Sequence, residues 1–89
     1  MKRNVLIIGA GGVAQVVAHK CAQNNDVLGD LHIASRTVAK CHAIIQSVHD
    51  KQAMKQDGVF RAHEVDGMDT AAVAALTKEP GCQIVINVG

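Results

Sequence analysis

Three glycines near the start of the chain are the residues best placed to do chemistry. They lie in the stretch GAGGVA (residues 9–14), directly after the apolar run 5–8. The spacing fits G-x-G-x-x-A: the first glycine allows a tight turn, the second lets a pyrophosphate approach the backbone, and the alanine lets a helix pack close to a strand. A turn without a ligand is the alternative, but glycine costs stability that such a turn need not accept. We expect the start of a helix to bind pyrophosphate here, through Gly9, Gly11, Gly12, Val13 and Ala14.

The residues 35–37 indicate which dinucleotide this turn would bind. Sites for NAD place Asp or Glu about 20 residues beyond the glycines, where the carboxylate holds the ribose 2′-hydroxyl. Here Ser35 stands 21 residues after Ala14, and Arg36 follows it. A hydroxyl and a guanidinium can bind a 2′-phosphate that a carboxylate would repel, and the guanidinium can stack on adenine. Ser35, Arg36 and Thr37 therefore predict NADP(H), although Arg36 could also be an ordinary exposed residue.

Two further places complete the expected site. Asp66 ends the third expected strand, where it would line the adenine pocket or lie in an exposed turn. Asn87 and Val88 end the fourth strand, at the edge of the crevice where a cofactor lies in this kind of sheet. We predict no catalytic residue, because the histidines and lysines on the helices fit exposed positions. The five His and three Cys residues also lack the spacing of a metal site.

The segments that must position these residues alternate between strand-like and helix-like patterns. Strands are expected over residues 5–8, 31–35, 59–65 and 83–88. A βαβαβαβ order requires parallel strands with right-handed crossovers. We therefore predict an α/β fold: half of a three-layer Rossmann-type parallel sheet with strand order 3-2-1-4 and helices on both faces.

Each expected helix has its own apolar stripe or boundary residues. The first carries apolar residues near helical spacing, at Val13, Val16, Val17 and Cys21. The second has Thr37 as its N-cap and a one-faced apolar stripe, formed by Cys41, Ile44, Ile45 and Val48. The third is capped by Asp69 and stopped by Pro80-Gly81.

Composition limits the broader class of the protein. The 89 residues suffice for one small domain, 48% are hydrophobic, and Phe60 is the single aromatic residue. A net charge of +1 with scattered basic residues argues against nucleic-acid binding. No apolar run approaches the roughly 18 residues of a membrane span. Three widely spaced cysteines indicate free thiols in a reducing compartment, so we expect a cytoplasmic protein.

The chain resembles the saccharopine dehydrogenase-like reductases. The resemblance rests on the stretches VLIIGAGGVAQVVAHKCAQN, IASRTVAKCHAI and QIVINVG, and it covers essentially all 89 residues. Within that family it is most similar to the carboxynorspermidine (carboxyspermidine) dehydrogenases of bacterial polyamine synthesis. The resemblance implies that NADPH reduces an imine formed between an amine and an aldehyde or keto acid.

The resemblance also implies that cofactor binding and substrate binding belong to separate domains. Residues 1–89 would be the N-terminal NAD(P)-binding domain, without the substrate domain of the full-length enzymes, and by themselves inactive. A shikimate dehydrogenase-like NADP oxidoreductase is the close rival, and a non-catalytic nucleotide-sensing module is the alternative from another class. Because the fourth strand would lie at an unpaired apolar edge, we also expect a homodimer.

Overall fold

The computed structural model describes residues 3–66, 69–78 and 81–88. Within these ranges strands and helices alternate along the chain, as the sequence predicts. The strands are β1 (Arg3–Ile8), β2 (Leu28–Ser35), β3 (Phe60–Glu64) and β4 (Cys82–Asn87). The helices are α1 (Gly12–Gln23), α2 (Val38–Asp50) and α3 (Thr70–Lys78). The order and type of the elements agree with the prediction, and the strand boundaries differ from it by up to three residues, at β2.

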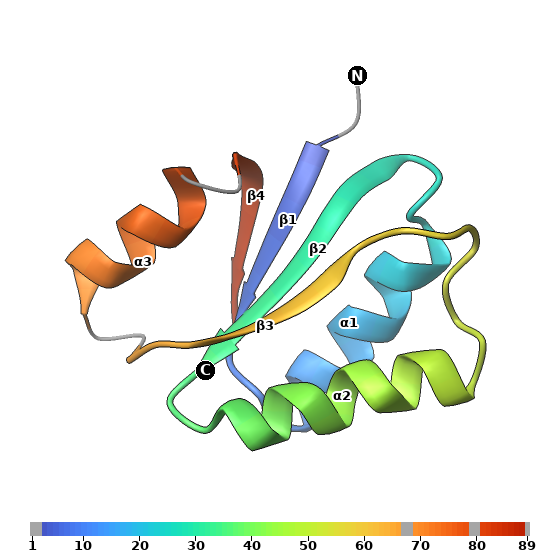
Figure 1. Ribbon diagram of the computed structural model, residues 1–89, viewed down its shortest axis with the longest axis horizontal. Coiled ribbons are helices and arrows are strands. Elements are labelled where there is room, and N and C mark those ends of the chain that lie inside the picture. Colours follow the sequence, from blue (N-terminus) through green and yellow to red (C-terminus); the bar gives the residue numbers. More distant parts are fainter. Residues whose placement is uncertain (1–2, 67–68, 79–80, 89) are drawn as a thin grey trace.

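The strands form one parallel sheet in the order β3-β2-β1-β4. Figure 1 shows α1 and α2 on one side of this sheet and α3 on the other. This arrangement follows from right-handed crossovers, because the chain moves outward from β1 to β3 and then returns across β1 to β4. The predicted fold class and strand order are confirmed.

Two apolar clusters hold the layers together, one on each face of the sheet. Val5 and Ile7 of β1 pack in the cluster that contains residues of α1 and α2. Leu6 and Ile8 alternate with them and pack in the cluster that contains residues of α3. β1 is therefore covered on both faces, which explains why its sequence is a continuous apolar run rather than an alternating one.

The prediction for the buried face of α1 is wrong at two positions. Val13 and Val16 are 63% and 62% exposed, whereas Cys21 is buried and Val17 packs against the cluster. The face that contacts the sheet consists of smaller side chains, at Ala14, Ala18, Cys21 and Ala22. Alanines at this spacing let the helix axis approach the strands closely, so the larger valines turn outward.

The boundaries of α2 and α3 confirm part of the prediction. The apolar stripe of α2 is buried at three of its four positions and half-buried at Ile45. Asp69 caps α3, since its Oδ1 accepts a hydrogen bond of 3.1 Å from the Ala72 N–H. Thr37 occupies the N-cap of α2, but its side chain makes no capping hydrogen bond. Pro80 lies outside the described residues, and Gly81 beside it has a φ of +68°.

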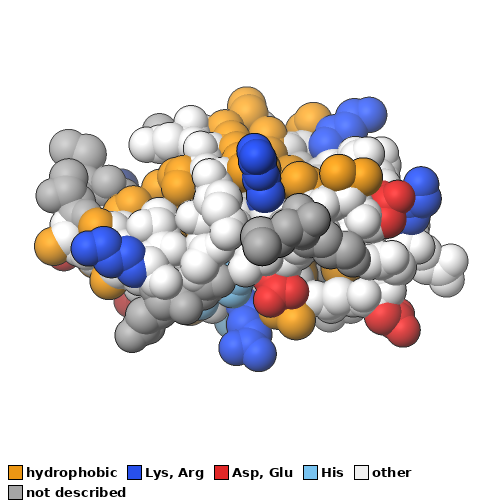
Figure 2. Space-filling view, turned by 90° about the horizontal axis from the view of Figure 1, so that it is seen from above, with side chains coloured by type: hydrophobic (Ala, Val, Ile, Leu, Met, Phe, Trp, Pro, Cys, Tyr) orange, Lys and Arg blue, Asp and Glu red, His pale blue; other side chains and the backbone are white. Residues whose placement is uncertain are grey.

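The surface gives two further observations. No helix among the described residues is long and apolar enough to cross a membrane. On the face of the molecule that Figure 2 shows, the Lys and Arg side chains stand apart from one another rather than forming one basic stripe.

A histidine pair links β2 to β3, with His32 buried and His63 half-buried. The His32 Nδ1 lies 2.9 Å from the His63 Nε2, and His32 is only 5% exposed. Burial lowers the pKa of both rings from the ordinary value of 6.5. The His63 and Arg61 charges lower the pKa of His32 further and Asp30 opposes them, while Arg61 adds to the lowering at His63. The pair is therefore neutral near pH 7.

This pair predicts that acid destabilises the fold. The unfolded chain takes up protons near pH 6.5, above the lowered folded-state pKa, so stability is complete above pH 6.5 and falls as the pH drops below it. The melting temperature should fall by several degrees between pH 7.5 and pH 5. A His32→Leu/His63→Leu double variant should show a clearly weaker acid dependence, whereas His49→Gln, at an exposed position of α2, should retain the wild-type dependence.

Candidate functional site

A cleft of about 340 Å³ opens where the carboxyl ends of the strands meet. Its walls include the last residues of β1, β2 and β4, together with Asp66 just beyond β3. β1 lies between β2 and β4, so the direction of the crossovers reverses beside it. Ligands of open α/β sheets bind at such a reversal. The volume is at the lower end of the range for ligand pockets.

The glycine turn forms one wall of the cleft. Gly9 has a φ of +126°, a backbone conformation that side chains rarely adopt, and its N–H donates a 2.8 Å hydrogen bond to the Ala34 carbonyl. Gly11 differs, because its φ of −86° is open to any residue and an added Cβ would meet no protein atom within 4 Å. The fold therefore requires a glycine at position 9 but not at position 11. A ligand that approaches the backbone closely would account for the second glycine.

The start of α1 lies beside this cleft, since its N-cap residue Gly11 is part of the lining. Gly11 is the N-cap and contributes no side-chain hydrogen bond, and the first turn of the helix holds no acidic residue. Gly12 and Val13 are exposed at this helix start, while Ala14 is fully buried against the sheet. The arrangement suits the phosphates of a dinucleotide, which would accept hydrogen bonds from the helix start.

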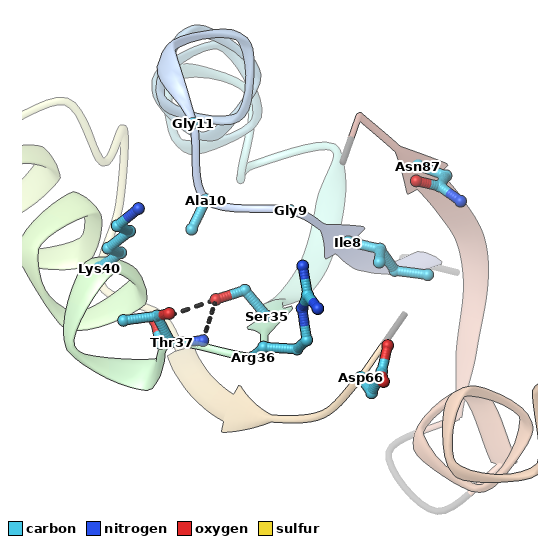
Figure 3. Close-up of a pocket in the computed structure, with 10 residues that line it drawn as sticks. All are labelled: Ile8, Gly9, Ala10, Gly11, Ser35, Arg36, Thr37, Lys40, Asp66 and Asn87. Carbon is cyan, nitrogen blue, oxygen red and sulfur yellow. Dashed lines mark hydrogen bonds between the residues drawn. The ribbon is translucent and has the colours of Figure 1, made fainter. Parts of the chain in front are cut away.

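A set of short hydrogen bonds shapes the loop between β2 and α2. The Ser35 hydroxyl accepts a 3.1 Å hydrogen bond from the Thr37 N–H and donates one of 2.9 Å to the Thr37 carbonyl, both drawn as dashed lines in Figure 3. The buried Cys41 thiol donates a further hydrogen bond, of 3.4 Å, to the Ser35 hydroxyl oxygen. Ser35 thus fixes the backbone of Thr37, the residue just before α2, but it accepts no backbone hydrogen bond from the first turn of the helix.

Two cations and one carboxylate set the charge of the cleft. Arg36 and Lys40 line it on the side of α2, and Asp66 lines it beyond β3. Figure 3 shows the Arg36 side chain extending from its loop toward the glycine turn. Lys40 lies in the first turn of α2, where a positive charge is unfavourable with the helix dipole. An anionic ligand bound beside these two residues would offset this cost.

The structure brings most of the predicted residues together. The cleft is lined by seven of the eleven, which are Gly9, Gly11, Ser35, Arg36, Thr37, Asp66 and Asn87. Gly12, Val13 and Ala14 lie in α1 behind the turn, and Val88 continues the β4 ladder with a hydrogen bond to the Ile8 carbonyl. Our sequence reasoning missed Lys40, although its spacing of three residues after Thr37 places it one turn along the same helix. Among the described residues, no cluster of three His, Cys, Asp or Glu side chains could hold a metal ion.

These features define a class of protein. A parallel sheet of order 3-2-1-4, a glycine turn at the start of α1 and a cationic β2–α2 loop together form the first half of a dinucleotide-binding Rossmann domain. Residues 5–89 match the family described as the saccharopine dehydrogenase NADP binding domain, and the chain belongs to this family. Its cofactor is NADP(H), as the sequence predicts.

Three curated relatives are similar to the chain. Carboxynorspermidine synthase from Vibrio alginolyticus is 52% identical over 96% of this chain and 21% of the relative. Carboxyaminopropylagmatine dehydrogenase from Synechocystis sp. is 37% identical over 94% of this chain and 19% of the relative. Shikimate dehydrogenase (NADP(+)) from Methanocaldococcus jannaschii is 39% identical over 72% of this chain and 22% of the relative. The chain therefore spans about a fifth of the length of these relatives.

Proposed function

We propose that the chain is the NADPH-binding part of an oxidoreductase that reduces an imine formed between an amine and an aldehyde or keto acid. The cleft between the Gly11 turn and the cations Arg36 and Lys40 is the observation that carries the cofactor half of this proposal. NADPH would supply hydride, while these residues would bind and orient it. The likeness to a carboxynorspermidine synthase over nearly the whole chain supports the imine half.

The proposal extends to the biological setting. By its likeness to that relative, the reaction would belong to polyamine synthesis, with aspartate semialdehyde as the aldehyde and a diamine as the amine. Residues 1–89 would be one domain, and substrate-binding groups would lie elsewhere in a full-length, homodimeric, cytoplasmic enzyme. The titratable side chains that line the cleft would all serve the cofactor, Arg36 and Lys40 at a phosphate and Asp66 at the adenine pocket, so we expect these 89 residues to bind NADPH without turnover.

A shikimate dehydrogenase-like oxidoreductase is the second candidate, favoured by the likeness to the Methanocaldococcus enzyme. The test is an NADPH-consumption assay on the product of the complete open reading frame. We expect consumption with aspartate semialdehyde only when a diamine is added. Reduction of NADP⁺ with shikimate would support the second candidate instead, and cofactor binding without turnover in either assay would support a nucleotide-sensing module.

A further inference from the structure

The Ser35 hydroxyl has three hydrogen-bond partners inside the protein. Its oxygen accepts from the Thr37 N–H and from the Cys41 thiol, and its hydrogen goes to the Thr37 carbonyl. A serine hydroxyl has one hydrogen to donate and two lone pairs to accept with. All three are therefore in use.

Only one of these three interactions can be exchanged for a ligand without disturbing the loop. The Thr37 N–H is fixed by the backbone, and the Cys41 thiol lies fully buried in α2, 0% exposed. The serine hydrogen can instead rotate about the Cβ–Oγ bond toward the cleft, because the Thr37 carbonyl also accepts a 3.0 Å hydrogen bond from the Lys40 N–H and so keeps a partner. With both lone pairs occupied, Ser35 faces a ligand as a donor.

We propose that Cys41 is a positioning residue for cofactor choice: by occupying the second lone pair of Ser35, its thiol keeps that hydroxyl a hydrogen-bond donor toward the 2′-phosphate of NADP(H). A phosphate oxygen can only accept hydrogen bonds, so a hydroxyl that donates one stabilises it. A ribose 2′-hydroxyl in NAD(H) gains most from an acceptor, such as the carboxylate of NAD sites. The inference rests on the proposed placing of the 2′-phosphate beside Ser35.

The chain offers a matched control for this role. Cys21 is also a buried cysteine, 8% exposed, but it lies in α1 and does not line the cleft. Replacing either thiol removes a small buried apolar group and should lower the melting temperature. Only the Cys41 replacement should also change the ratio of the Kd for NADH to the Kd for NADPH. A change in that ratio therefore distinguishes a role in orienting the Ser35 hydroxyl from a role in core packing alone.

The experiment measures both Kd values for the wild type, Cys41→Ala, Cys41→Val, Cys41→Ser and Cys21→Ala. We expect the two variants without a donor at position 41 to lower the ratio roughly two- to fivefold, as the loss of one weak hydrogen bond implies. Cys41→Ser, which retains a donor, should keep the wild-type ratio or raise it. Cys21→Ala should leave the ratio unchanged.

Two results would overturn the inference. One is an unchanged ratio in both Cys41→Ala and Cys41→Val with only a lower melting temperature, which would leave Cys41 a packing residue. The other is a Cys41→Ser variant whose ratio of the two Kd values falls as far as that of Cys41→Ala. A wild type that binds NADH and NADPH equally would instead contradict the proposed 2′-phosphate site itself, and the inference would fail with it.

Discussion

Replacement of Gly11 by aspartate is expected to abolish cofactor binding without destabilising the free protein. The backbone at Gly11 already has the extended conformation of an N-cap, and an added Cβ meets no protein atom. An aspartate there would accept hydrogen bonds from the first turn of α1 and interact favourably with the helix dipole. The gain in stability should be a few tenths of a kcal/mol, because glycine is already an acceptable N-cap residue.

The same carboxylate would take the place of the pyrophosphate. It would occupy the N–H groups that the phosphates need and repel their negative charge, so we expect affinity for both NADPH and NADH to fall at least about 100-fold, which corresponds to about 3 kcal/mol. Calorimetric titration measures the affinity and thermal unfolding measures the stability. Val16→Asp is the control, because it adds a carboxylate to the exposed face of the same helix. Wild-type affinity in Gly11→Asp would show that the pyrophosphate binds elsewhere.

The sequence predicts this fold well where the pattern is local. A continuous apolar run, a glycine turn and the stripe of Cys41, Ile44 and Val48 each specify an element from neighbouring residues. The buried face of α1 could not be predicted from the local pattern, because its alanines and valines are both apolar. The distance between the helix and the sheet determines which of these side chains face the sheet. The His32–His63 contact also depends on the register of β2 against β3, which is set by the whole sheet.

The residues of the site also differ in whether the sequence alone predicts their place. Ser35 and Arg36 follow a strand at a spacing that the fold imposes, so their place in the cleft was predictable. Lys40 enters the cleft only because α2 starts at Val38 and turns its first positions toward the glycine turn. One hydrogen-bond partner of Ser35 is the Cys41 thiol, six residues further along the chain. A single sequence gives no sign of this contact.

Arg36→Ala should weaken NADPH binding about 10- to 100-fold and change NADH binding by less than about threefold. A hydrogen bond to a charged group contributes about 1.5–3 kcal/mol, and the cofactors differ at this end only in the 2′-phosphate. Lys40→Ala should act in the same direction but less strongly, because an ammonium lacks the two-pronged geometry of a guanidinium. Fluorescence titration of each variant with both cofactors measures this difference, and Lys20→Ala, an exposed cation of α1, is the control.

The double variant tests whether both cations bind one phosphate. If they do, each single replacement leaves the other cation in contact with the phosphate, so the two losses should not simply add. A purely additive result would place Lys40 on a separate group of the cofactor. The prediction for Arg36 fails if the wild type binds NADH and NADPH equally, or if Arg36→Ala weakens both to the same degree. In that case the 2′-phosphate would lie outside the β2–α2 loop, and the choice of NADP(H) would depend on residues other than those of this cleft.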